Sequence, residues 1–172
     1  MRIHSLFLEN EKEWPAWRLN RAGLTLIEMM MVVLVIGLLA AIAFPAFRKA
    51  RIKTQVVQTA NDMKVFGDAF DLYAMERAGY PPDCDLPDPW HLPNTAMEEY
   101  LDEKKWKALT PLGGNYNWEG PDFYDYAGIA LDDQSAEADI VEKLDKTFDD
   151  GSLTEGKFRQ MANGRYTWVL EE

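Results

Sequence analysis

Glu28 is the only charged residue in the apolar run from Leu24 to Phe47, which is 24 residues long. An acidic side chain costs about 2.5–3.5 kcal/mol near the middle of a membrane-spanning helix, and less near its end. A carboxylate kept at that cost is expected to have a partner and a function. The chemistry that Glu28 offers is ion pairing with a cation that the side chains of the run do not supply.

The run that contains Glu28 is long enough to cross a membrane. A transmembrane helix needs roughly 20 mostly apolar residues to cross about 30 Å of hydrocarbon, and no other segment of the chain has them. Residues 1–23 do not form a conventional secretory signal, because charges and tryptophans precede the run and no small-residue cleavage site follows it. We expect residues 24–47 to be a transmembrane helix.

The apolar pattern continues beyond this run with helical spacing. From Ile52 to Tyr73 apolar residues recur at alternating intervals of four and three, which marks one face of a helix. Gly79 and the two prolines after it end the pattern. The sequence therefore predicts one helix over residues 24–78, whose second half, 48–78, packs on the chain's own sheet. A coiled-coil seam is the alternative for that half.

Residues 79–172 are expected to form a small globular domain. Period-two patterns and turn residues predict three strand regions, and helical spacing predicts two short helices. The strand regions are 116–118, 123–131, and a hairpin of 157–162 with 165–170 around Asn163-Gly164. The helices are 95–102, opened by a capping box and with Leu109 as an alternative end, and 136–148, with Ser135 as N-cap. The fold class is α+β: a long N-terminal helix packed on a small antiparallel sheet.

The residues around Glu28 resemble a known processing site. Residues 21–28, RAGLTLIE, resemble the prepilin site of type IV pilins and type II secretion pseudopilins. The resemblance implies that a prepilin peptidase/methyltransferase cuts between Gly23 and Leu24 and methylates the new amino terminus of Leu24. It also implies that Glu28, fifth in the mature chain, acts in filament assembly. Leu24 is a departure, since the family usually has phenylalanine there.

Gly37 and Pro45 extend the resemblance, because many family members have glycine and proline at these positions. Pro45 has no amide hydrogen to donate to the carbonyl of residue 41, so it should kink or loosen the helix. The resemblance implies that the helix unwinds between Gly37 and Pro45 when subunits pack in a filament.

The resemblance implies a structural subunit and not an enzyme. Once the leader is removed, the chain would polymerise with other copies and with minor pilins or pseudopilins, on an inner-membrane assembly platform. It would first span the inner membrane once, with residues 79–172 in the periplasm, and then enter a pseudopilus or a type IV pilus. Glu28 would pair with the amino terminus of a neighbouring subunit. The alternative from another class is an anchored periplasmic binding domain that never polymerises.

Basic residues flank the apolar run on both sides and complicate its orientation. Two precede it and four follow it, at Arg18, Arg21, Arg48, Lys49, Arg51 and Lys53. The positive-inside rule alone would favour a cytoplasmic C-terminal domain. The periplasmic orientation therefore depends on the processing motif.

Composition excludes several other functions. The formal net charge of −11 argues against nucleic-acid binding, which requires a basic surface. Cys84 is the only cysteine, so the chain forms no internal disulfide, which favours a pseudopilin or a disulfide-free pilin. No nucleophile motif, phosphate loop or histidine constellation is present.

Calcium is the one cofactor that we consider, since some major pseudopilins hold it in an acidic loop near the C-terminus. The candidate ligands are Asp132, Asp133, Asp145, Asp149 and Asp150. They do not fit an EF-hand, because aligning Gly151 with its glycine places lysines at the first and last ligand positions. A helix-ending turn is the simpler interpretation of residues 149–151.

Overall fold

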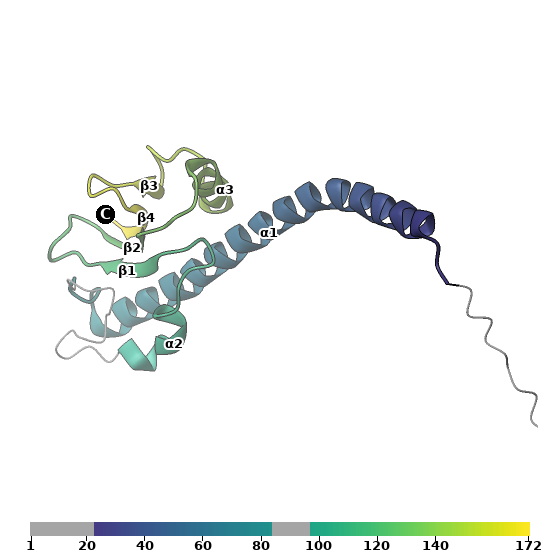
Figure 1. Cartoon of the computed structure of the whole chain (residues 1–172). Coiled ribbons are helices and arrows are strands. Elements are labelled where there is room, and N and C mark those ends of the chain that lie inside the picture. The colour runs from purple at the N-terminus through teal and green to yellow at the C-terminus, as the bar shows by residue number, and fades with distance from the viewer. Residues whose placement is uncertain (1–22, 84–96) are drawn as a thin grey trace, which may run out of the picture. The chain divides into compact units, whose positions relative to one another are not determined.

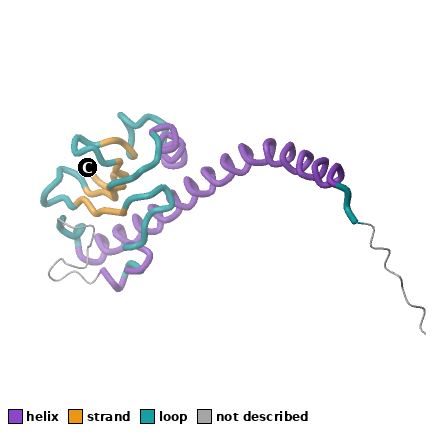
Figure 2. The backbone as a smooth tube through the Cα atoms, viewed as in Figure 1, coloured by secondary structure: helices purple, strands orange, loops and turns teal. Residues whose placement is uncertain are grey.

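The computed structural model describes residues 23–83 and 97–172 (Figure 1). Its first element is the helix α1, and a series of short helices and strands follows (Figure 2). In chain order these are α1 (Leu26–Arg77), η2 (Met97–Glu99), α2 (Glu103–Trp106), β1 (Asn115–Glu119), β2 (Ala127–Asp132), α3 (Ala138–Phe148), β3 (Phe158–Gln160) and β4 (Tyr166–Glu171).

The helix α1 confirms the single helix predicted over residues 24–78. It is 52 residues long, and the helix is unbroken through Pro45. It ends where Ala78 takes a left-handed φ of 60° and the amide of Gly79 donates to the carbonyl of Ala74, a closure that commonly ends helices. The chain divides between Ala43 and Phe44 into two compact units.

The two parts of α1 have different surroundings. Every residue from Leu26 to Phe47 is exposed, and an 18-residue window of the helix has a mean hydropathy of 2.7. One helix of the described chain is thus long and apolar enough to cross a membrane. In the later part, one face is buried from Val56 to Tyr73.

The four strands form one antiparallel sheet in the order β1-β2-β4-β3. Trp118 of β1 is paired with Ile129 of β2, which is in turn paired with Trp168 of β4. The strands β3 and β4 form the predicted hairpin, and Gly164 in its loop has a φ of +86°, a conformation that glycine adopts readily. The predicted α+β fold is confirmed.

Aromatic side chains join α1 to the sheet. The ring of Phe70 stacks on that of Trp118, with centroids 3.8 Å apart. The ring of Phe66 meets Tyr116 at 4.9 Å and Trp106 at 5.0 Å, both edge to face. These are favourable aromatic geometries. The second half of α1 therefore packs on the chain's own sheet, as predicted.

The last strand also reaches α1, through a glycine. A Cβ built on Gly67 would lie 2.6 Å from the indole ring of Trp168 and 3.3 Å from Leu170. Tyr166 on the same strand packs against the core as well. Trp168 and Leu170 of β4 therefore lie against the helix at Gly67. Only a residue without a side chain allows this close approach.

Three local predictions are wrong. The strand predicted from Phe123 begins only at Ala127, because the residues before it form turns that place Tyr126 against Glu119. Ser135 does not cap α3, since the N-cap is Glu137, which makes no side-chain cap bond.

The third wrong prediction is the helix over residues 95–102. Its first two residues lie outside the described chain, and the remainder is the short η2. Asp102 interrupts it, because its carboxylate accepts hydrogen bonds from the amides of Lys104 and Lys105 and so begins α2.

Candidate processing and assembly site

The predicted cleavage site lies just before α1. Gly23, Leu24 and Thr25 have no helical structure, and α1 begins at Leu26. A Cβ built on Gly23 would meet no atom of the described residues within 4 Å, and Leu24 is 73% exposed. The bond between Gly23 and Leu24 is therefore open and non-helical, which is the state of chain that proteases cleave most readily.

Thr25 and Glu28 form a capping box at the start of α1. The Glu28 carboxylate oxygen Oε2 accepts hydrogen bonds from the amide and the hydroxyl of Thr25, both at 2.8 Å. In return, the amide of Glu28 donates to the Thr25 hydroxyl oxygen at 3.3 Å. Such a box satisfies amide donors that the first turn of a helix leaves unpaired.

The capping box gives Glu28 a role within its own chain. A negative charge in the first turn is also favoured by the helix dipole. The second carboxylate oxygen, Oε1, makes no hydrogen bond to any described residue. This role was not predicted from the sequence, although the spacing Thr-x-x-Glu before an apolar run is its known signal.

Gly37 and Pro45 lie within continuous helix. No atom would lie within 4 Å of a Cβ on Gly37, so its surface is open. Pro45 is the one proline inside α1. Unwinding between these two residues stays a prediction, as do the cleavage, methylation and assembly roles of Gly23, Leu24 and Glu28.

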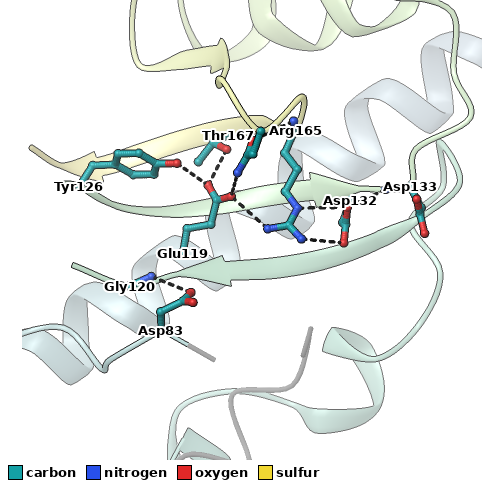
Figure 3. A network of polar contacts seen from close by, with 9 residues as sticks. Asp83, Glu119, Gly120, Tyr126, Asp132, Asp133, Arg165 and Thr167 are labelled. Atoms are coloured by element: carbon teal, nitrogen blue, oxygen red, sulfur yellow. Dashed lines mark hydrogen bonds and ion pairs between the residues drawn. The ribbon is translucent and has the colours of Figure 1, made fainter. Parts of the chain in front are cut away.

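The calcium candidate Asp132 already has a cationic partner. Its carboxylate contacts the Arg165 guanidinium at 3.1 Å through Nε and at 3.2 Å through Nη2 (Figure 3). Asp133 follows in a tight turn with a φ of +50°. A calcium ion at Asp132 would have to compete with this ion pair.

Arg165 belongs to a larger network around Glu119, which sequence analysis missed. Glu119 is fully buried on β1, and its carboxylate accepts hydrogen bonds from Tyr126 at 2.9 Å and Thr167 at 2.7 Å (Figure 3). It also accepts from Asn163 at 2.8 Å and Arg165 at 3.4 Å. A buried carboxylate is tolerated when it is satisfied in this way. The network ties β1, β2 and the β3–β4 hairpin together.

The other calcium candidates lie at the end of α3. Asp149 accepts a hydrogen bond from the amide of Lys157, and Asp150 accepts one from the amide of Ser152 at 2.7 Å. Asp145 is fully buried, and neither of its oxygens has a hydrogen-bond partner in the described chain. Burial raises the pKa of Asp145, and the charges of Asp150 and Asp149 raise it further.

No group of three or more acidic, histidine or cysteine side chains in residues 23–83 and 97–172 is placed to hold a metal ion. The loops at Asp149 and Asp150 use these carboxylates to bind backbone amides, as a helix-ending turn does. Calcium binding stays a prediction. Among the candidate ligands, Asp145 is the one whose carboxylate oxygens have no hydrogen-bond partner among the described residues.

Comparison with known proteins bears directly on the N-terminal site. Residues 18–44 match the family described as the prokaryotic N-terminal methylation motif. The chain carries the N-terminal motif of pilins and pseudopilins. The resemblance drawn from residues 21–28 is therefore confirmed, and the capping box of Thr25 and Glu28 lies inside the matched motif.

Curated relatives agree with the motif. The type II secretion system core protein G of Escherichia coli K12 is 29% identical over 101 residues, which is 59% of this chain and 61% of that protein. The protein of the same name from Pseudomonas aeruginosa is 34% identical over 37% of this chain and 45% of its own length. A fimbrial protein of Pseudomonas aeruginosa is 39% identical over 31% of this chain and 35% of its own.

The chain thus spans less than two thirds of the length of these relatives. None of the three names denotes an enzyme. No solved structure matches the chain significantly.

Proposed function

We propose that the chain is a prepilin-like structural subunit. A prepilin peptidase/methyltransferase removes residues 1–23 and methylates Leu24. Residues 24–47 then hold the chain in the inner membrane, with residues 79–172 in the periplasm. The mature subunit polymerises through its apolar helix, with minor pilins or pseudopilins and an inner-membrane assembly platform as partners.

The observation that carries this proposal is the arrangement at the start of α1. An open bond after Gly23 is followed within five residues by Glu28, and then by exposed apolar helix up to Phe47. An apolar helix surface of this length needs either lipid or neighbouring protein to cover it. In the proposed function, the membrane covers this surface with lipid first, and neighbouring subunits cover it after assembly into a filament.

A secretion pseudopilus is favoured over a type IV pilus. The similarity to the Escherichia coli secretion protein extends over 101 residues, whereas that to the fimbrial protein covers 54 residues. The longer match reaches beyond the N-terminal helix, which pilins and pseudopilins share.

An anchored domain that does not polymerise is the second candidate. It is favoured by the capping box, because a Glu28 that caps its own helix has a use without any neighbour. The two candidates differ in what the charge of Glu28 does. In a filament the charge pairs with a neighbouring amino terminus, whereas in an anchor the cap alone matters.

The experiment compares Glu28→Gln with Thr25→Val in cells that assemble filaments. Glutamine retains the capping box, which accepts either Glu or Gln, but it removes the charge. Valine at position 25 removes the cap and keeps the charge. A filament subunit predicts normal cleavage of Glu28→Gln with a severe loss of sheared filaments, and a milder defect for Thr25→Val. Wild-type filament yield from Glu28→Gln would contradict the proposed ion pair.

A further inference from the structure

A groove with an apolar floor lies between α1 and α3. It has a volume of about 570 Å³, within the range of small-molecule sites. On α1 it is lined by residues spaced three and four apart from Pro45 to Val57, which is one helical face. On α3 the lining residues are Lys143 and Thr147, one turn apart. All of these residues belong to the compact unit that begins at Phe44.

The floor of the groove is apolar, although much of it is accessible. Ile52 is half-buried, and Val57 remains 52% exposed. Val56 beneath them is buried in the core. The surface therefore offers hydrocarbon contact that no described part of the chain covers.

The rim of the groove is basic. Arg48, Lys49 and Lys53 line it from α1 and make no ion pair within the described residues. No acidic residue occurs in the 33 positions between Glu28 and Asp62, so this cationic stretch stands out in a chain of net charge −11.

On the α3 side the charges are mixed. Lys143 forms an exposed ion pair with Asp139 at 2.7 Å, and Glu142 is its neighbour in the chain. The unpaired positive charge of the groove is therefore concentrated on α1. A ligand with one anionic end would place that end near α1.

The position of the groove along the helix suggests where such a ligand comes from. On α1 the lining residues begin at Pro45, inside the apolar run that ends at Phe47, and continue directly beyond it. Lys53 is six residues beyond Phe47, or about 9 Å at 1.5 Å per residue. The polar headgroup layer of a bilayer occupies about 5–8 Å on each side of the hydrocarbon core. A chain that crosses the bilayer with residues 24–47 would thus place Arg48 and Lys49 within the headgroup layer and Lys53 just beyond its outer edge.

We propose that this groove binds an anionic phospholipid of the surrounding membrane. The headgroup phosphate accepts charge-assisted hydrogen bonds from Arg48, Lys49 and Lys53. Part of an acyl chain lies on Pro45 and Ile52, the apolar lining residues nearest the hydrocarbon edge. The lipid would seat the C-terminal domain against the membrane surface before the subunit leaves the bilayer. This inference requires the membrane anchoring of the proposed function but does not require polymerisation.

The test uses the full chain reconstituted in phosphatidylcholine vesicles that contain a trace of photoreactive lipid. One sample receives phosphatidylglycerol with a photoreactive acyl chain, and the other receives phosphatidylcholine with the same group. After irradiation, mass spectrometry maps the labelled peptides. Labelling within residues 24–47 reports membrane insertion, whereas labelling of the Lys143–Thr147 peptide of α3 reports occupation of the groove.

The anionic lipid is expected to label α3 at least about fivefold more than the neutral lipid, since each cation near a membrane surface contributes about that factor. Lys49→Glu and Lys53→Glu should each reduce this labelling by about the same factor or more. The matched control is Lys104→Glu, an exposed residue of α2 outside the groove, which should leave the labelling unchanged.

Two results would overturn the inference while leaving the proposed function intact. These are equal labelling of α3 by both lipids, and labelling of residues 24–47 with none on α3. Absence of labelling in residues 24–47 would instead contradict membrane anchoring and, with it, the proposed function.

Discussion

The side chain of Glu28 can serve both the folding and the proposed assembly of this chain, because it caps α1 together with Thr25 and also carries a charge. Glu28 holds the first turn of α1 through one carboxylate oxygen, Oε2, while Oε1 makes no bond to the described residues. Cleavage after Gly23 would create an ammonium group at Leu24, next to Thr25. A buried carboxylate and ammonium are costly alone and recover much of that cost as a pair.

Gly23 provides a residue-scale test of processing. Because no atom of the described residues would lie within 4 Å of a Cβ at this position, Gly23→Val should leave the fold of the chain intact. We expect it to abolish removal of residues 1–23, since the family motif requires glycine before the cut. Immunoblots of membrane fractions, with circular dichroism as the check on folding, would measure this. Efficient cleavage of Gly23→Val would show that recognition does not depend on the glycine.

Asp145 provides a second residue-scale test. Its pKa in the folded chain is raised above the ordinary 3.8, so the folded state binds this proton more tightly than the unfolded state does. Ionisation of Asp145 therefore lowers the free energy of unfolding progressively as the pH rises from 3.8 through the raised pKa of the folded state. Asp145→Asn should raise stability at pH 7, where the wild-type carboxylate is charged, and have little effect below pH 3.8.

Denaturant titrations at pH 3.5 and pH 7, in the presence of a chelator, would measure this difference. Repeating the pH 7 titration with calcium tests the metal prediction at the same residue. Calcium that stabilises the wild type and not Asp145→Asn would place an ion at Asp145. An Asp145→Asn variant less stable than wild type in the chelator would contradict the unpaired state of this carboxylate.

At the scale of elements, α1 is one helix with two uses. Its first part is exposed and apolar apart from Glu28, and its later part contributes Phe66 and Phe70 to the core of the C-terminal domain. Gly67 lies between these two aromatic residues and admits the Trp168 ring of β4 against the helix backbone. The contact between helix and sheet therefore depends on the absence of a side chain at one position.

Gly67→Ala should destabilise the C-terminal domain by about 1–3 kcal/mol, because the added methyl group would overlap the Trp168 ring. The matched control is Gly37→Ala in the same helix, where the surroundings are open. Alanine there should leave the domain's stability unchanged, since only local helix propensity improves. Thermal unfolding followed by tryptophan fluorescence would compare the two. Equal stability of both variants would contradict the close packing at Gly67.

Local patterns predicted α1 and the β3–β4 hairpin because their signals lie in neighbouring residues. The spacing from Ile52 to Tyr73 and the Asn163-Gly164 turn do not depend on distant parts of the chain. The Glu119 network could not be predicted in this way. Its members come from β1, the loop before β2 and the final hairpin, and only the register of the strands brings them together.

The whole chain combines a processing motif, an apolar helix and a small sheet domain. The motif and the helix could be recognised from sequence, since both consist of contiguous residues. The groove between α1 and α3 could not be, because Lys53 and Lys143 are 90 positions apart and meet only in the fold. The capping box could have been found from its spacing.

Prepilin processing is tested most directly by the intact mass and N-terminal sequence of the chain extracted from membranes. The measurement needs cells with an active prepilin peptidase and matched cells without it. The expected result is a chain that starts at Leu24 and carries one additional methyl group in the first cells, and the full chain in the second. A chain that starts at Met1 in both would contradict prepilin processing and leave a single-pass anchored domain.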